Sequence, residues 1–256
     1  MGENILLTLE YDGSAYHGWQ RQKNSVSIQQ TLEQALSAIY QQPVAVIGAG
    51  RTDAGVHAYG QRANFISPRP VPLAKLAGIV NAKLPPDIRV RQAEAVAADF
   101  HARYDAKGKL YRYLIEQGGP ASAFTGRYSW QVGGPLDEAA MRAAAQYLLG
   151  RHDFRHFTVS GVSAVNFVRQ IRRLELSQPP TGPGFFPWQR LQSPLVLEAA
   201  ADGFLYKMVR IITGRLVAVG RGLLRPEQIR DFLAGSLDLH IPPAPPQGLM
   251  LMEVYY

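Results

Sequence analysis

The sequence contains no cysteine among its 256 residues. Disulfides therefore cannot hold the fold together, and no thiolate is available as a nucleophile. Zinc sites that depend on cysteine ligands are excluded for the same reason. Any chemistry that the chain performs must come from oxygen and nitrogen side chains.

Long hydrophobic runs are also missing, because no apolar stretch reaches the roughly 18 residues that a transmembrane helix needs. The first residues, MGENILLTLEYDG, show no basic leader followed by an apolar stretch and a small-residue cleavage site. A hydrophobic fraction of 46% with 18% charged residues is typical of globular proteins. We therefore expect a cytoplasmic protein with no membrane partner.

Acidic residues are fewer than basic ones, 20 against 27, which gives a formal charge of +7 and a pI of about 9.7. A positive balance raises the local concentration of polyanions and favours a nucleic-acid partner. Charge alone leaves that partner open, since many basic proteins bind no nucleic acid. If the chain acts on RNA bases, its lack of cysteine excludes the zinc deaminases that use cysteine ligands.

Apolar periodicity predicts strands and helices in mixed order, without strict alternation, which favours an α+β fold with a largely antiparallel sheet. Helices are expected over 28–40, 73–83, 137–149, 204–219 and 225–234. Strands are expected over 5–11, 44–48, 56–66, 88–97, 109–117, 168–177, 194–201 and 249–255.

A similar order of elements follows in the second part of the chain. We therefore predict two halves, residues 1–105 and residues 106–256, although no long linker separates them. The segment 178–194 is rich in proline and glycine and is expected to be an excursion loop.

The most informative segment is GAGRTDAGVHA, residues 48–58. Glycines at 48 and 50 after a strand resemble a dinucleotide-binding loop, but Asp53 stands where the third glycine belongs, and its carboxylate would face a pyrophosphate. An ordinary turn with a solvated Asp53 is one alternative. The other is a carboxylate displayed into a cleft by flexible backbone, suited to attack on a sugar carbon or to capture of a sugar proton. No second carboxylate completes a glycosidase pair nearby.

GAGRTDAGVHA resembles the signature of the tRNA pseudouridine synthase A family, and further motifs of that family follow in order along the chain. Residue 211 is Ile, where the family often has Asn. The matching segments are YDGSAYHGWQ (11–20), IQQTLEQAL (28–36), NAKLPPDIRV (81–90), DFHARYDAKGKLYRY (99–113), LLGRHDFRHF (148–157), DGFLYKMVRIITGRL (202–216) and APPQGLMLMEV (244–254).

The resemblance implies that Asp53 is the catalytic nucleophile or base. It implies that Arg210 forms an ion pair with Asp53 and orients this carboxylate. Tyr111 would stack on the target base, a contact that is worth roughly 1–3 kcal/mol. Attack at C1′, attack on the base and deprotonation at C2′ all remain open for Asp53.

Two further residues are assigned to substrate binding by their motif. Arg51 would fill the space left by the flipped base or hold a phosphate, and His57 would support the catalytic loop. The resemblance implies neither a cofactor nor a metal. His152 and His156 have the i, i+4 spacing of zinc ligands, but no third ligand is evident.

The implied fold is the pseudouridine synthase α+β fold, with two similar halves around a central cleft. The implied activity is isomerisation of uridine to pseudouridine at positions 38, 39 and 40 of the tRNA anticodon arm by a homodimer. Two alternatives remain: a non-catalytic tRNA-binding or chaperone protein of the same fold, and an RNA N-glycosidase.

Overall fold

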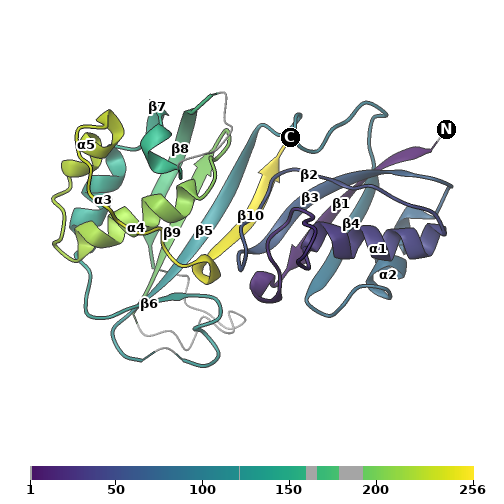
Figure 1. Cartoon of the computed structure of the whole chain (residues 1–256), viewed down its shortest axis with the longest axis horizontal. Coiled ribbons are helices and arrows are strands. Elements are labelled where there is room, and N and C mark those ends of the chain that lie inside the picture. Colours follow the sequence, from purple (N-terminus) through teal and green to yellow (C-terminus); the bar gives the residue numbers. More distant parts are fainter. Residues whose placement is uncertain (1, 121, 160–165, 179–192) are drawn as a thin grey trace. The chain divides into compact units, whose positions relative to one another are not determined.

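The computed structural model describes residues 2–120, 122–159, 166–178 and 193–256 (Figure 1). The chain divides into two compact units. Unit 1 comprises Met1–Lys107 together with Met250–Tyr256, and unit 2 comprises Gly108–Leu249. Most of the predicted loop over 178–194 lies outside the described residues.

The sheet of unit 1 has the strand order β4 (Ile88–Ala95), β1 (Glu3–Tyr11), β3 (His57–Ser67) and β10 (Leu249–Tyr255). β1 is antiparallel to both β3 and β4, while β10 runs parallel to β3, with Met250 opposite His57. The short strand β2 (Ile47–Gly48) is antiparallel to β3. The C-terminal strand therefore completes the sheet of the unit that contains the N-terminus.

Two helices belong to unit 1, α1 (Ile28–Tyr40) and α2 (Leu73–Asn81). α1 begins where Ser27 accepts a hydrogen bond from the Gln30 backbone N–H at 3.3 Å. Its buried residues Ile28, Leu32 and Leu36 repeat every four positions and form one apolar face, as the periodicity predicts.

Unit 2 has an antiparallel sheet of β5 (Gly108–Gln117), β9 (Pro194–Ala201), β8 (Val168–Ser177) and β7 (Gly150–Asp153). β6 (Trp130–Val132) pairs in parallel with β5.

The helices of unit 2 are α3 (Glu138–Gln146), α4 (Met208–Gly220) and α5 (Gln228–Ala234). Asp137 caps α3 by accepting from the Ala140 N–H at 2.9 Å. α4 is buried along almost its whole length, which makes it the central helix of this unit. Short 3-10 turns occur at η1 (Gly13–Ala15), η2 (Arg155–Phe157) and η4 (Pro246–Gly248).

The predicted α+β class with a largely antiparallel sheet is confirmed. Several details differ from the prediction. Helices α3 and α5 are shorter than expected: α3 ends at Gln146 rather than at residue 149, and α5 begins at Gln228 rather than at residue 225. The helix expected from residue 204 begins at Met208, because Lys207 adopts a left-handed backbone with φ 59°. The strand expected over 44–48 is limited to two residues, and the short strands β6 and β7 were not predicted, because so few residues carry little alternation. Among the described residues, no helix has the length and apolarity required to span a membrane.

Candidate active site

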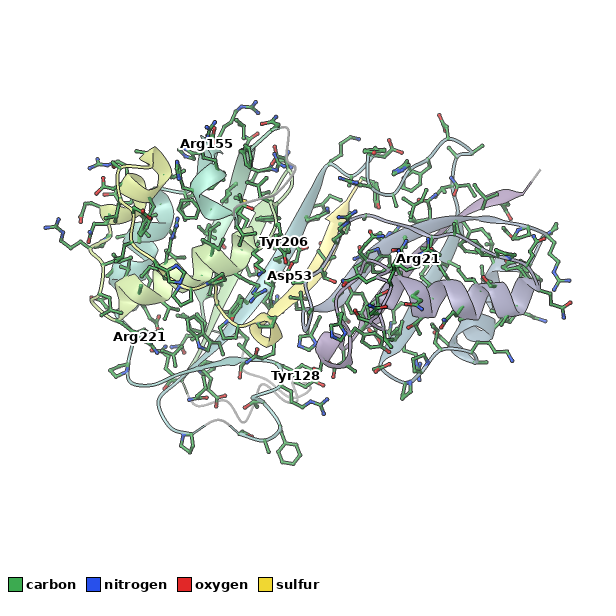
Figure 2. The ribbon with its side chains drawn as sticks, viewed as in Figure 1. Arg21, Asp53, Tyr128, Arg155, Tyr206 and Arg221 are labelled. Carbon is green, nitrogen blue, oxygen red and sulfur yellow. The ribbon has the colours of Figure 1, made fainter. Side chains whose placement is uncertain are left out.

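Asp53 lies in the loop that joins β2 to β3 in unit 1 (Figure 2). The loop turns directly after it, because the Val56 N–H donates to the Asp53 carbonyl at 3.1 Å and Gly55 has a φ of 76°. The Asp53 side chain is half-buried, whereas Arg51, two residues earlier, is exposed. The glycine-flanked bend predicted from the sequence is thus present.

The neighbouring residue Thr52 fixes the loop to the core of unit 1. It is only 6% exposed, and its hydroxyl lies 2.8 Å from the Tyr11 hydroxyl. The Thr52 carbonyl accepts the Trp19 backbone N–H at 3.0 Å. The hydroxyl and the carbonyl of Thr52 are therefore each bonded to a buried aromatic residue, which restrains the backbone that precedes Asp53.

Gln61 on β3 extends this network under the loop. Its amide nitrogen donates to the Gly50 carbonyl at 3.0 Å and to the Tyr11 hydroxyl at 3.3 Å. Gln61 is fully buried, and burial raises the pKa of Tyr11 to about 12, so this phenol stays protonated at neutral pH. Such a satisfied buried network rigidifies the backbone that it holds.

Gly18 permits the close approach of the Trp19 segment to the loop. Its φ of 89° is left-handed, and a Cβ at this position would lie 2.4 Å from the Thr52 carbonyl oxygen. A side chain at residue 18 would therefore force the two segments apart.

His57, the first residue of β3, is 2% exposed. Its Nδ1 lies 3.1 Å from the Gly13 backbone N–H, which donates to it, and 3.2 Å from a carboxylate oxygen of Asp12. His57 thus connects β3 to the turn that follows β1. Its predicted part in substrate binding stays a prediction.

Tyr111 lies on β5 of unit 2, opposite Ala199 of β9. It is 7% exposed, and its ring meets the ring of Phe204 edge to face with 5.2 Å between centroids. This geometry is favourable for aromatic pairs and restricts rotation of the Tyr111 ring.

Arg210 lies in the first turn of α4 and is half-buried. Its Nε donates to the Ala244 carbonyl at 2.8 Å, and the Ala244 N–H returns a bond of 2.9 Å to the Arg210 carbonyl. The next carbonyl, that of Pro245, accepts the Tyr113 hydroxyl at 2.6 Å. Burial raises the pKa of Tyr113, while the positive charge of Arg210 opposes that shift. Arg210 and β5 are therefore tied to the same connecting segment.

The five site residues predicted from the sequence thus lie in two sets. Arg51 and Asp53 lie in one loop of unit 1 and His57 begins the strand that follows this loop, whereas Tyr111 and Arg210 belong to unit 2.

The supporting residues Tyr11, Gly18 and Gln61 were not predicted. A polar residue inside an apolar strand, such as Gln61, is a signal for a buried network. The sequence does not indicate which carbonyl it reaches.

The histidine pair suggested by RHDFRH serves other contacts. The His152 Nε2 lies 2.7 Å from the Leu149 carbonyl, and the ring of His156 packs against Gly235. Across the described ranges, no group of three or more histidine, aspartate or glutamate residues is arranged to hold a metal ion.

Comparisons with known proteins agree with the motifs of the sequence. A family model described as tRNA pseudouridine synthase matches residues 8–105 and 144–256. The chain is 44% identical over 253 residues to tRNA pseudouridine synthase A of Syntrophotalea carbinolica, covering 98% of this chain and 96% of that relative. It is 43% identical over 254 residues to the protein of the same name from Acetivibrio thermocellus, covering 99% of each.

A solved structure, that of a Cbf5-Nop10-Gar1 complex, matches with a TM-score of 0.37 at 10% identity, covering 96% of this chain and 57% of the matched one. The family model spans most of the chain, and the two relatives match nearly its full length, so the predicted family is confirmed. The chain belongs to the tRNA pseudouridine synthase family.

Proposed function

We propose that this protein isomerises uridine to pseudouridine in tRNA. In that reaction the bond between C1′ and N1 breaks, the uracil rotates, and C1′ bonds to C5. C5 loses its proton and N1 gains one, so no atom is added or lost overall. The near full-length likeness to proteins named tRNA pseudouridine synthase A supports this activity.

The observation that carries the proposal is the immobilised loop around Asp53. Hydrogen bonds from Tyr11, Trp19 and Gln61 hold the backbone on the N-terminal side of this carboxylate. A reacting group that is held in place before the substrate arrives avoids the entropic cost of finding its position during the reaction. We assign Asp53 as the nucleophile or base, acting at C1′, on the base or at C2′.

The other predicted residues take supporting roles. Arg210 pairs with the Asp53 carboxylate and orients it. Tyr111 stacks on the uracil after it leaves the helical stack, which offsets part of the unstacking cost. Arg51 holds a phosphate or fills the space of the displaced base, and His57 supports the loop. Residues 1–105 supply the Asp53 loop and residues 106–256 complete the cleft. No metal or cofactor takes part.

The target uridines are those at positions 38, 39 and 40 of the anticodon arm, and the working form is a cytoplasmic homodimer. The formal charge of +7 supports binding of a large polyanion. Light scattering after size-exclusion chromatography tests the dimer, because a single species at the monomer mass across micromolar concentrations contradicts it.

The decisive test of activity incubates the purified protein, with a chelator, and an unmodified tRNA transcript, and maps pseudouridine at each position. We expect product at positions 38–40 with wild type, and none with Asp53→Asn. This variant should bind tRNA about as tightly as wild type, because shape and phosphate contacts dominate affinity for RNA. Asp99→Asn removes an equal charge from an exposed site of the same unit and should leave turnover intact.

The outcomes separate the alternatives. Free uracil without pseudouridine would identify an N-glycosidase. Binding of tRNA without either product would identify a non-catalytic tRNA-binding protein. Appreciable turnover by Asp53→Asn would refute the assignment of this carboxylate.

A further inference from the structure

Unit 2 contains a pocket that plays no part in the proposed reaction. It has a volume of about 440 Å³ and lies between the η2 turn, α4 and α5. A volume of this size accommodates a small organic ligand. Its polar lining includes Arg155, His156, Arg215 and Asp238.

Arg215, from the middle of α4, is the buried cation of this pocket. It is 9% exposed, and its Cζ lies 3.9 Å from the ring centroid of Phe232 and 4.2 Å from that of Phe157. These cation–π contacts stabilise the charge in part. Among the described residues, its Nε and Nη1 have no hydrogen-bond partner. Burial lowers the pKa of Arg215 to about 10, so the group still carries its charge at neutral pH.

No carboxylate of the described chain forms an ion pair with Arg215, and residues 160–165 and 179–192 contain no Asp or Glu. Asp238 lines the pocket but is exposed. The nearby Arg155 is already paired with Asp153 at 2.7 Å. A buried charge without a counterion destabilises the fold. An anionic ligand that enters the pocket offsets part of this destabilisation.

The rest of the lining combines exposed basic side chains with apolar walls. Arg155 and His156 are exposed beside the pocket, and Phe167, Leu237 and Leu239 provide apolar walls.

Gly235 ends α5 with a φ of 72°, and a Cβ there would lie 2.5 Å from the His156 ring. The left-handed glycine therefore lets α5 pack directly against the turn that carries His156.

We propose that this pocket binds the phosphate group of a nucleotide, with Arg215 as its buried counterion. A phosphate has several acceptor oxygens for the Arg215 guanidinium and for the N–H groups of the neighbouring Arg155 and His156. The apolar walls accept the flat base or the ribose. Two sources carry this chemistry, a free nucleotide and a nucleotide of bound RNA. Binding of a free nucleotide does not depend on the proposed activity, whereas binding of an RNA nucleotide rests on the proposal that the protein binds tRNA.

Calorimetric titration of the full chain with uridine monophosphate tests the site, with uridine and acetate as controls for base and charge. We expect saturable binding of one equivalent of uridine monophosphate and none of uridine or acetate. The Arg215 Nε–H resonance should shift during the titration. Absence of saturable binding up to millimolar nucleotide would overturn the proposal.

Variants assign the binding to Arg215. Arg215→Met should fold with equal or higher Tm, because an apolar residue of similar volume is tolerated in place of a buried charge. It should weaken nucleotide binding at least about tenfold, as expected for a lost charged hydrogen bond. Arg221→Met is the matched control, since Arg221 is exposed and lies well away from Arg155 in unit 2 (Figure 2).

Equal affinities of the two methionine variants would overturn the assignment. If Arg215→Met does not fold, the exposed double variant Arg155→Gln/His156→Gln takes its place, with the same expected weakening. Competition with tRNA then identifies the source. Displacement of uridine monophosphate by tRNA indicates a nucleotide of the RNA, and independent binding indicates a free nucleotide. Wild type that forms pseudouridine but binds no nucleotide would refute this site alone.

Discussion

The hydroxyl of Tyr11 offers a direct test of whether the network under the Asp53 loop sets the rate of the reaction. Tyr11→Phe removes the partner that lies 2.8 Å from the Thr52 hydroxyl and 3.3 Å from the Gln61 amide. Gln61 keeps its bond to the Gly50 carbonyl, and Thr52 keeps its backbone bond to Trp19. The loop should therefore loosen without unfolding.

Two magnitudes follow from these contacts. Leaving the buried Thr52 hydroxyl unsatisfied costs about 1–3 kcal/mol of unfolding free energy. In a protein of this size, each kcal/mol lowers the Tm by roughly 2–4 °C. A displacement on the order of 1 Å of a reacting group costs up to about 100-fold in rate. Since one of the two anchors of Thr52 remains, we expect kcat to fall about tenfold.

The assay measures pseudouridine formation at saturating and subsaturating tRNA, together with thermal unfolding. We expect KM for tRNA to change less than about twofold, because phosphate contacts dominate affinity. Tyr40→Phe is the matched control: Tyr40 accepts a buried hydrogen bond from Ser67 at 2.9 Å, at the opposite end of β3. It should lower Tm similarly and leave kcat unchanged. Equal kcat values for the two variants would refute the positioning role of Tyr11.

Arg210→Ala should lower kcat far more than it weakens tRNA binding, and the reverse pattern in kinetics and filter binding would identify Arg210 as a phosphate anchor. The logarithm of the tRNA association constant should fall by about 0.7–0.9 per log unit of salt for each phosphate neutralised, so a flat titration contradicts a basic binding surface. The unfolding free energy should decrease as pH rises from about 10 to about 12, because the unfolded chain ionises its tyrosines while Tyr11, whose pKa burial raises to about 12, stays protonated. Denaturant titrations at both ends of that range should show a smaller loss for Tyr11→Phe than for wild type.

Local signals determine several elements of this fold. Ser27 followed by Ile28, Leu32 and Leu36 specifies both the start and the buried face of α1. The glycine-flanked bend around Asp53 follows from its composition alone, since it needs only backbone freedom over a few residues. The motifs that indicated the family are also contiguous in sequence, and the comparisons confirmed them.

Other features depend on residues that are distant in sequence. β10 runs parallel to β3 and returns the C-terminus to unit 1, although its own alternation predicts only a strand. Which strand it joins is decided by packing and by the hydrogen bonds that its neighbours leave open. In the same way, α4 begins four residues later than its apolar period suggests, because Lys207 takes a left-handed turn.

Sequence by itself therefore determined the family, the class of fold, the presence and type of the longer elements, and the candidate Asp53. Tertiary structure decided what holds Asp53, namely Tyr11, Gln61 and the close passage of Gly18, and it placed Arg215 in a pocket without a counterion. The physical reason is the separation along the sequence over which each interaction acts. Periodicity and capping act over a few residues, whereas a hydrogen bond such as that between Tyr11 and Thr52 joins positions 41 apart, and it forms only once burial of the whole unit has offset the entropy of bringing them together.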